Sequence, residues 1–247
     1  MVIREIEARS ILSRSKVFDY TVNPYVGCQH GCTYCYARFM KRFTGHKEPW
    51  GEFVDVKINA PQLLLRQIQR VPRGRVWISG MCDPYQPLEG RYQMTRKCLE
   101  ILVDYGWPLT VQTKSPLVLR DLELLKKARN VEVGLTVTTA DEGIRKLFEP
   151  SAPPIRERIN ALEKVHLSGI RTYAMIAPIL PGVEQIAVHL EGKVDYVLID
   201  KMNYHYADWV YRRHGLEKAG TDSFFTSKAR ELASIMAKKH IECQILF

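Results

Sequence analysis

The chain has 247 residues, 46% of them hydrophobic, and a formal net charge of +9 from 36 basic and 27 acidic residues. Ordinary glycine and proline contents exclude collagen-like and disordered chains. The length suits one large domain or two small ones, and we favour one because α/β barrels reach this size undivided. No run reaches the roughly 18 apolar residues of a membrane span, and the amino terminus is charged from its fourth residue. We therefore expect a cytoplasmic protein without a membrane segment. The basic excess favours a polyanionic partner, with nucleic acid the obvious one, although a basic solubilising surface would explain it equally well.

The predicted elements alternate between strand and helix. A short strand at 19–23 opens the series, and its helix follows at 61–71. Five further pairs of an apolar run and an amphipathic helix follow in chain order: 75–80 with 91–106, 108–114 with 117–130, 131–137 with a helix near 155–168, 171–179 with 183–192, and 195–202 with 227–240. A strand at 242–247 ends the chain. Strands that are apolar on both faces and alternate with helices indicate a parallel sheet covered by helices.

Six such units predict an α/β fold, a partial (β/α)6 TIM-like barrel with a short C-terminal extension. We expect a single domain over 1–247. Its parts are an N-terminal extension (1–19), the barrel strands with the cysteine loop (20–202), and a C-terminal cap, helix and strand (203–247).

Polar residues gather where the predicted strands end. In parallel barrels the chemistry lies at the carboxyl ends of the strands, so these positions predict one shared pocket. They are Ser79 to Asp83, Lys114, Thr136 to Thr139, Ala177 to Pro178, and Lys201 to Asn203.

Three cysteines, Cys28, Cys32 and Cys35, lie within eight positions of "NPYVGCQHGCTYCYAR". In a reducing compartment such a cluster binds metal or performs redox chemistry more often than it forms disulfides. Structural zinc usually takes four protein ligands, and His30 between the cysteines is the one candidate for a fourth. Three thiolates can instead hold three irons of a [4Fe–4S] cube and leave the fourth iron open to a small molecule. Both interpretations remain open at this point.

The spacing Cys28-x3-Cys32-x2-Cys35, with an aromatic residue before the last cysteine, resembles the signature of radical S-adenosylmethionine (SAM) enzymes. Within that superfamily the chain looks like the spore photoproduct lyase-like, DNA repair photolyase-related branch. The resemblance covers residues 10 to 182 through the blocks "SILSRSKVFDYTVNPYVGCQHGCTYCYARFM", "SGMCDPYQPLEGRY", "QTKSPLVLRDLELL", "LFEPSAPPIRERINAL" and "AMIAPILPG". The last 65 residues match less specifically.

The resemblance implies a [4Fe–4S] cluster on Cys28, Cys32 and Cys35, and SAM bound at the open iron. In such enzymes the reduced cluster donates an electron to SAM, and the resulting 5′-deoxyadenosyl radical abstracts hydrogen from the substrate. An electron donor such as ferredoxin or flavodoxin is then a further partner. Lys114 resembles the family lysine that meets the SAM carboxylate, although a surface lysine is the alternative.

Four further positions carry roles that the resemblance implies. Thr136 resembles the fourth-strand hydroxyl that contacts the nucleoside, and Ala177 resembles the fifth-strand residue whose backbone meets the adenine. Tyr34 and Tyr36 match tyrosines that lie beside SAM and take part in radical transfer in spore photoproduct lyase; packing around the cluster is the alternative.

The segment "SGMCDPYQP" departs from the lyase pattern. Aligned on Asp83, the lyase's hydrogen-donor cysteine falls on Gly80, and the position of a small hydroxyl residue that contacts SAM falls on Cys82. Cys82 is therefore expected either to donate hydrogen from a shifted position or only to contact SAM. Asp83 is a candidate for orienting the SAM amino group or a substrate, and equally a turn initiator. Glu149, in "FEP", is expected to support the pocket from behind.

The stretch 201–215, "KMNYHYADWVYRRHG", mixes aromatic and basic residues. Such a mixture suits base stacking with phosphate contact, although a partly buried cap would have the same composition. We therefore expect a radical SAM enzyme whose substrate is a nucleic acid, with a peptide or a small metabolite as the enzymatic alternative. A non-catalytic metal-binding protein that binds nucleic acid is the alternative of a different class.

Overall fold

The computed structural model describes residues 1–247. Its internal contacts divide the chain into two compact units. The first comprises Met1–His30 and Ala37–Val133, and the second comprises Gly31–Tyr36 and Gly134–Phe247. The single domain over 1–247 that the sequence predicts stays a prediction. None of the helices is long and apolar enough to cross a lipid bilayer.

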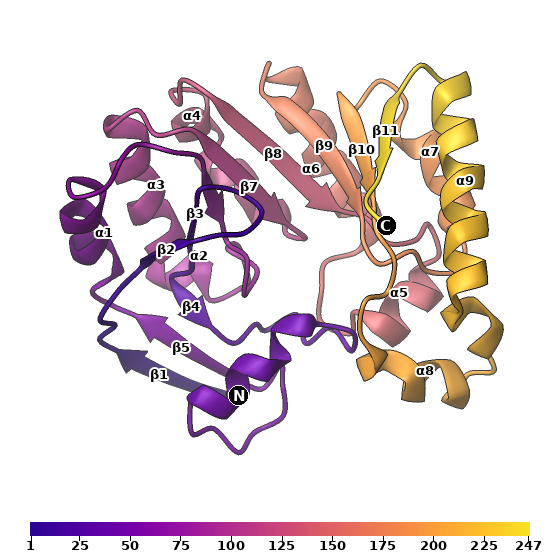
Figure 1. Cartoon of the computed structure of the whole chain (residues 1–247), viewed down its shortest axis with the longest axis horizontal. Helices are drawn as coiled ribbons and strands as arrows, with labels where there is room; N and C mark the ends of the chain where they lie inside the picture. Colours follow the sequence, from indigo (N-terminus) through magenta and orange to yellow (C-terminus); the bar gives the residue numbers. More distant parts are fainter. The chain divides into compact units, whose positions relative to one another are not determined.

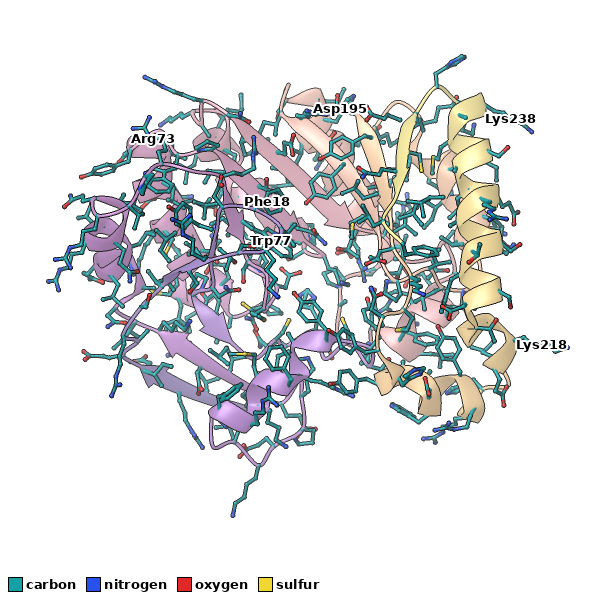
Figure 2. All side chains as sticks on the ribbon, viewed as in Figure 1. Phe18, Arg73, Trp77, Asp195, Lys218 and Lys238 are labelled. Carbon is teal, nitrogen blue, oxygen red and sulfur yellow. The ribbon has the colours of Figure 1, made fainter.

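The first unit contains a sheet whose neighbouring strands, in order, are β2 (Leu12–Arg14), β3 (Tyr20–Val22), β6 (Val76–Ile78) and β7 (Leu109–Thr113). β3, β6 and β7 are parallel, whereas β2 joins β3 antiparallel. The connecting helices are α1 (Ala60–Ile68), α2 (Glu89–Tyr92), α3 (Met94–Asp104), the 3-10 helix η2 (Pro116–Asp121) and α4 (Leu122–Leu125). On this sheet the Phe18 ring lies edge-on against Trp77 of β6, with 5.8 Å between the ring centroids (Figure 2).

A second, three-stranded sheet in the first unit was not predicted. Its strands are β1 (Val2–Ile6), β5 (Phe53–Lys57) and β4 (Tyr25–Val26), with β5 in the centre. β1 and β5 run parallel and side by side although about fifty residues separate them in the sequence (Figure 1). The burial of β1 does not alternate: its first and last residues are half-buried and the three between them are exposed. The 3-10 helix η1 (Tyr36–Phe43) precedes β5.

The second unit carries the strands β8 (Val131–Thr136), of which the second half belongs to this unit, β9 (Arg171–Ile176), β10 (Tyr196–Ile199) and β11 (Glu242–Ile245), in that order. β9, β10 and β11 are parallel, and the long helix α9 packs along β11 (Figure 1). The helices are α5 (Glu142–Phe148), α6 (Ile155–Leu167), η3 (Val183–Gln185), α7 (Ile186–Leu190), η4 (His205–Ala207), α8 (Asp208–Arg213), η5 (Glu217–Gly220) and α9 (Asp222–Lys238).

The predicted chain order of six strand–helix units and a last strand is confirmed. Three predicted helices differ in detail. The helix expected at 183–192 is the 3-10 helix η3 followed by the short helix α7. The helix expected at 91–106 is broken at Gln93, whose φ of 55° lies in the left-handed region, so that α2 ends and α3 begins there. The helix expected at 117–130 is a 3-10 turn followed by α4, which ends at Leu125; beyond it the Lys127 and Ala128 N–H groups bond three residues back, to Leu124 and Leu125. The helices α5 and α8 were not predicted.

Candidate active site

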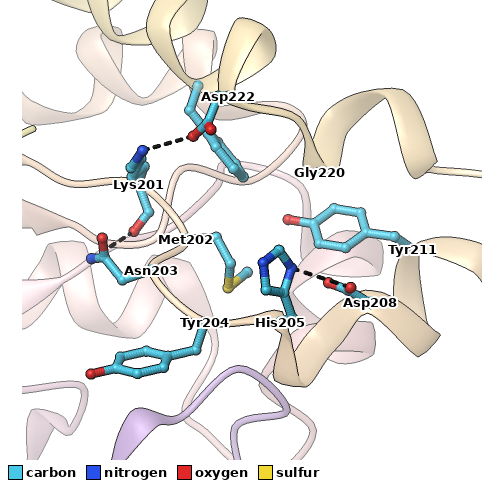
Figure 3. A pocket seen from close by; sticks show the side chains of 10 residues that line it. Lys201, Met202, Asn203, Tyr204, His205, Asp208, Tyr211, Gly220 and Asp222 are labelled. Carbon is cyan, nitrogen blue, oxygen red and sulfur yellow. Dashed lines mark hydrogen bonds and ion pairs between the residues drawn. The ribbon is translucent and has the colours of Figure 1, made fainter.

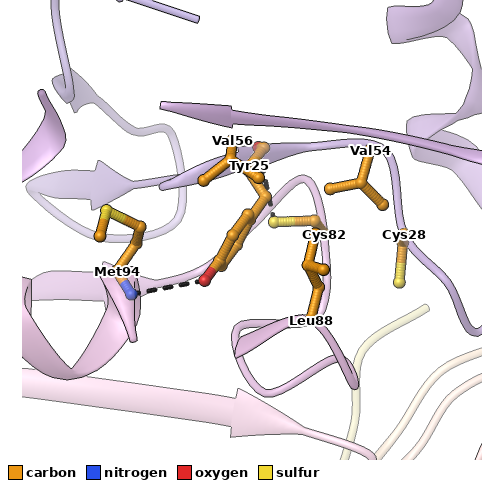
Figure 4. Packing of buried hydrophobic residues seen from close by; sticks show 7 residues of the cluster. All are labelled: Tyr25, Cys28, Val54, Val56, Cys82, Leu88 and Met94. Carbon is orange, nitrogen blue, oxygen red and sulfur yellow. Dashed lines mark hydrogen bonds between the residues drawn. The ribbon is translucent and has the colours of Figure 1, made fainter. Parts of the chain in front are cut away.

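The first part of the cysteine loop lies in the first unit. Cys28 is buried, with 7% of its surface exposed, and belongs to a cluster with Val54 of β5 and Cys82 (Figure 4). Gly27 precedes it with a φ of 92°, and a Cβ atom at Gly27 would lie 2.3 Å from the carbonyl oxygen of Phe53. A side chain cannot be accommodated that close, so glycine is required for this approach of the loop to β5.

Gln86, a fully buried residue of the loop after β6, fixes the backbone beside Cys28. Its Oε1 accepts a hydrogen bond from the Gln29 N–H at 3.0 Å, and its Nε2 donates to the Gly27 carbonyl at 3.3 Å. The Gln29 side chain in turn accepts from the Leu88 N–H at 2.5 Å. The cysteine loop and the loop after β6 therefore hold each other by reciprocal side-chain bonds.

Cys82 lies in the same buried cluster as Cys28. Its Sγ is 3.2 Å from the Ser79 hydroxyl and donates to the Tyr25 carbonyl at 3.6 Å. Ser79 in turn donates to Asn23 Oδ1 at 2.6 Å, which ties the end of β6 to the end of β3. Burial raises the pKa of Cys82 to about 12, only partly offset by the Ser79 hydrogen bond, so the thiol keeps its proton at neutral pH.

Asp83 links the ends of β6 and β7. Its Oδ1 accepts from the Thr113 hydroxyl at 2.5 Å and from the Tyr85 N–H at 2.9 Å. Its Oδ2 accepts from the Lys114 N–H at 2.7 Å. The carboxylate therefore caps its own turn, as the interpretation of Asp83 as a turn initiator predicts, and it also fixes the backbone that carries the half-buried Lys114. Its expected role toward the SAM amino group or a substrate stays a prediction.

The second part of the cysteine loop lies in the second unit. The Cys35 N–H donates to the Cys32 carbonyl at 3.2 Å, which forms a tight turn between the two cysteines. Thr33 anchors this turn, because its N–H and its hydroxyl both donate to the Phe148 carbonyl, at 2.9 and 3.2 Å. Cys32 is buried and Cys35 half-buried.

Tyr34 joins a buried charged network at Glu149. Its hydroxyl donates to the Glu149 carboxylate, which also accepts from the Thr138 hydroxyl at 3.3 Å and pairs with Arg158 Nη2 at 2.6 Å. Arg158, on α6, donates to the Thr136 carbonyl at 3.1 Å. Burial and the neighbouring Glu149 carboxylate raise the pKa of Tyr34 well above its usual range, so the phenol keeps its proton.

This network connects the cysteine turn to the end of β8. Glu149 therefore fixes the Tyr34 hydroxyl, whereas its expected support of a SAM pocket stays a prediction. Burial alone would lower the pKa of Arg158, but the Glu149 carboxylate outweighs it and raises that pKa.

Tyr36, the residue after Cys35, begins a stack of three tyrosines. Its ring lies 6.3 Å from the Tyr204 ring at an interplanar angle of 21°, and Tyr204 lies 5.6 Å from Tyr206 at 6°. Tyr36 and Tyr204 are 38% and 49% exposed. The 201–215 stretch and the cysteine turn therefore meet in an aromatic platform that solvent can reach.

The two remaining predicted residues lie at or just after the ends of strands in the second unit. Thr136 is buried at the end of β8, and Ala177 is half-buried at a cis peptide bond to Pro178. Of the other cysteines, Cys98 is buried in α3 and Cys243 is half-buried in β11.

The donor set fits an iron–sulfur cluster. Cys28, Cys32 and Cys35 form no disulfide, and they lie on a loop whose backbone is fixed at both ends by the bonds described above. Thiolates are the ligands that such clusters take. Cys28 belongs to the first unit and the other two cysteines to the second, and neither unit by itself contains a group of three or more His, Cys, Asp or Glu side chains placed as a metal site.

Sequence reasoning missed two residues that position the loop. Gln86 had no signal of its own, because an amide in a polar loop predicts nothing about its partners. Arg158 did have one: it occupies a position of α6 that the apolar spacing of Ile155, Ile159 and Leu162 assigns to the buried face. A charged residue on a buried face requires a buried partner.

The model of the radical SAM superfamily matches residues 22–187. The uncharacterized protein MJ0683 of Methanocaldococcus jannaschii is 38% identical over 73% of this chain and 69% of that protein. The radical SAM Nalpha-GlyT isomerase of Pseudomonas phage M6 is 22% identical over 91% of this chain and 49% of that protein. The chain also spans about half of the length of a Mycobacterium tuberculosis relative, the uncharacterized protein Rv2578c, to which it is 32% identical over 70% of its own length.

Among solved structures, the chain is similar to spore photoproduct lyase complexed with dinucleoside spore photoproduct, with a TM-score of 0.75, 15% identity, and coverage of 99% of this chain and 82% of that chain. It is also similar to Streptococcus suis SuiB bound to precursor peptide SuiA, with a TM-score of 0.61, 14% identity, and coverage of 92% and 48%. These likenesses confirm the predicted fold, a partial barrel that does not close.

Proposed function

Since the chain belongs to the radical SAM superfamily, we propose that it is a lyase-like radical SAM enzyme that acts on nucleic acid. Its cofactors are those of the superfamily, a [4Fe–4S] cluster and SAM, and it is an enzyme. The substrate class, the residue roles and an electron donor such as ferredoxin or flavodoxin are parts of the proposal.

Cys28, Cys32 and Cys35 hold the cluster in this proposal. When bound, the cluster and SAM supply the reductive cleavage that generates a 5′-deoxyadenosyl radical. The chain's own contribution is to hold the loop: Gln86 fixes its first part and Thr33 its second. A loop held at both ends keeps three thiolates in place and leaves the fourth iron without a protein ligand.

SAM is held by residues at the strand ends. Lys114 supplies a compact cation for the SAM carboxylate, and Asp83 fixes the backbone that carries this lysine. Thr136 and the Ala177 backbone contact the nucleoside. Two sets of contacts support this assignment. The Asp83 carboxylate accepts a hydrogen bond from the Lys114 N–H. Arg158 bonds to the Thr136 carbonyl and pairs with Glu149, which in turn accepts from Tyr34.

Tyr34, Tyr36 and Cys82 are the proposed catalytic residues. Tyr34 and Tyr36 flank Cys35 in the sequence, and in this proposal both lie beside the bound SAM. Cys82 packs in one cluster with Cys28 and carries an intact S–H group, which suits either hydrogen donation to a substrate radical or contact with SAM. The Cys82→Ala variant separates these roles: if the radical is quenched normally in the product, Cys82 is not the donor.

The stack of Tyr36, Tyr204 and Tyr206 is the observation that carries the substrate class. Exposed aromatic rings beside basic side chains are the usual platform for single-stranded nucleic acid, because every base has a face that stacks. The stack begins one residue after a cluster cysteine, so covalent connection alone keeps it beside the site of radical formation. The net charge of +9 supports attraction of a polyanion.

Deuterium transfer tests the proposal. The anaerobically reconstituted chain, with dithionite and SAM, is incubated with deuterated single-stranded DNA, tRNA or peptide, and 5′-deoxyadenosine is analysed by mass spectrometry. We expect deuterium from a nucleic acid and none from the peptide pool. Deuterium from the peptide alone would overturn the substrate class and leave the radical chemistry intact. One tightly held zinc with no SAM cleavage would overturn the assignment of the cysteines.

A further inference from the structure

Polar side chains away from the cysteine loop form bonded groups in both units. In the second unit, around a pocket of about 190 Å³, Lys201 pairs with Asp222 at 2.7 Å (Figure 3). On the same wall His205 lies 3.3 Å from Asp208, so these side chains satisfy one another. In the first unit the group is centred on Asn23, which follows β3, and it includes a residue of the proposed reaction.

The side-chain amide of Asn23 has a single orientation that suits its neighbours. The Met81 N–H, which can only donate, lies 2.8 Å from Oδ1, so the oxygen faces Met81 and Nδ2 faces Thr21. The Thr21 hydroxyl donates its own hydrogen to the Trp77 carbonyl at 3.1 Å, and its oxygen accepts from Nδ2 at 3.2 Å. The Lys57 side chain fixes the main chain at this position, because it donates to the Asn23 carbonyl at 2.9 Å.

The Ser79 hydroxyl has only one hydrogen, and Asn23 receives it. The two oxygens lie 2.6 Å apart, and Asn23 Oδ1 can only accept, so Ser79 donates there. Toward Cys82 Sγ, at 3.2 Å, the Ser79 oxygen is then left to accept. The other partner of the thiol, the Tyr25 carbonyl at 3.6 Å, is also an acceptor. Both partners of Cys82 therefore compete for its single hydrogen, and neither donates a hydrogen to the sulfur.

The surroundings of the thiol offer its hydrogen no other acceptor. Cys82 is 9% exposed and packs with Val54 and Leu88, which are apolar (Figure 4). An S–H group is a weak donor, but turning it away from both oxygens would still lose its hydrogen bond. The hydrogen of Cys82 is therefore held between Ser79 and Tyr25.

We infer that Asn23 is a positioning residue for Cys82: it takes up the Ser79 hydrogen and thereby directs the Cys82 hydrogen toward Ser79 and Tyr25, away from a substrate radical. The inference rests on the proposed function, in which Cys82 either donates hydrogen or contacts SAM, and it selects contact through the sulfur. The hydrogen that quenches a substrate radical then comes from another group.

The S–H stretching band in the infrared spectrum tests the direction of the hydrogen in the full chain. Subtracting the spectrum of Cys82→Ala, which keeps every other thiol, isolates the band of Cys82. In Asn23→Leu the Ser79 hydrogen loses its acceptor and turns toward the sulfur, so the Cys82 hydrogen loses Ser79 and its band should move to higher frequency. Asn23→Asp keeps the acceptor oxygens, and its band should stay at the wild-type frequency.

Asn59→Leu is the matched control. Asn59 also bonds to a backbone N–H and a backbone carbonyl, both of Ala8, but it belongs to a different group. Its replacement should lower the urea concentration of half-unfolding and leave the Cys82 band in place. A similar band shift in Asn59→Leu would show a general structural effect and overturn the inference.

A second variant covers the case in which Asn23→Leu does not fold. Ser79→Ala removes the oxygen that accepts from the thiol, so the Cys82 band should again move to higher frequency. An unchanged band in either variant, once folded, overturns the inference.

Solvent deuterium tests the consequence in the reconstituted enzyme. In D₂O the Cys82 thiol exchanges its hydrogen for deuterium. After reaction of single-stranded DNA or tRNA with SAM and dithionite, the modified nucleoside should carry the same deuterium content with the wild type and with Cys82→Ala. A lower content with Cys82→Ala would show that the thiol hydrogen reaches the radical, and would overturn the inference. If no nucleic acid is modified, the proposed substrate class fails, whereas the infrared band still decides the role of Asn23.

Discussion

At Glu149 one buried carboxylate meets the hydroxyls of Tyr34 and Thr138 and the guanidinium of Arg158. Neither Glu149 nor Arg158 has an exposed side chain, so each charge depends on the other. The pair also orients the hydroxyl of the tyrosine between the last two cysteines. A single residue thereby couples the stability of the second unit to the placement of Tyr34.

Glu149→Gln should destabilise the protein by about 3–5 kcal/mol, because it leaves the Arg158 charge buried without its counter-charge. Tyr34→Phe should cost less, about 1.5–3 kcal/mol, the worth of one hydrogen bond to a charged group. Urea unfolding monitored by circular dichroism measures both. Glu231→Gln, which breaks a surface pair with Lys228, is the control and should cost less than about 1 kcal/mol. Equal effects of Glu149→Gln and Glu231→Gln would contradict the coupling.

The cysteines are the second prediction at this scale. Cys28→Ala, Cys32→Ala and Cys35→Ala should each reduce the iron bound after anaerobic reconstitution from about four atoms per chain to below about one, since each removes one cluster ligand. Cys243→Ala should retain the iron of the wild type. Iron analysis and the visible charge-transfer band provide the measurement. Full iron content in Cys28→Ala would show that the cluster is held elsewhere.

At the scale of elements, strand β8 depends on a glycine where it passes β9. A Cβ atom at Gly134 would lie 2.2 Å from two ring atoms of Tyr173, which is buried and stacks 5.2 Å from Tyr196. The Tyr173 ring on β9 can therefore pack against β8 only because Gly134 has no side chain. This close approach fixes the end of β8, where Thr136 lies.

Gly134→Ala should destabilise the protein by about 1–3 kcal/mol, because the buried ring has to move. Tyr173→Leu in the same background should recover part of that loss, so the double variant should be more stable than the sum of the singles predicts. Gly90→Ala is the control: its Cβ would meet only Leu117 at 4.0 Å, and in helix α2 the substitution should be neutral or stabilising. Strict additivity of the Gly134 and Tyr173 variants would refute the steric explanation.

At the scale of the whole molecule, the net charge of +9 has a measurable consequence. Binding of a strand to basic side chains releases counterions, so the logarithm of the binding constant falls linearly with the logarithm of salt concentration. If nucleic acid is the partner, the charge should act mainly on this salt-dependent part of the affinity.

The affinity for a dT decamer should fall with salt at a slope of about −2 to −4, as expected for three to five phosphate contacts on a single strand. Replacing Arg212 and Arg213 with alanine should make the slope shallower by about 1.4 and leave the ratio of the affinities for dT and dA decamers unchanged. Lys238→Ala, at an exposed lysine of α9, should leave the slope unchanged (Figure 2). A slope near zero for the wild type would show that the charge serves solubility alone.

The amino-acid sequence by itself determined the cysteine spacing, the order of six strand–helix units and the superfamily. These are local properties, because a repeat of apolar residues or a fixed spacing of cysteines is contained in one short stretch of the sequence. The resemblance also identified Glu149 as a candidate, because its block matches as a whole; its role behind the site stays a prediction.

Only the tertiary structure decided the partners. The pairing of β1 with β5, the hold of Gln86 on Gly27 and Gln29, the network of Tyr34 with Glu149 and Arg158, and the stack of Tyr36 on Tyr204 join residues that lie far apart in the chain. A buried charged group needs a partner. The apolar spacing of α6 predicts that Arg158 is buried, but it does not predict that Glu149 is the partner. Which donor meets which acceptor depends on where the folded backbone brings each side chain, and no local pattern records that position.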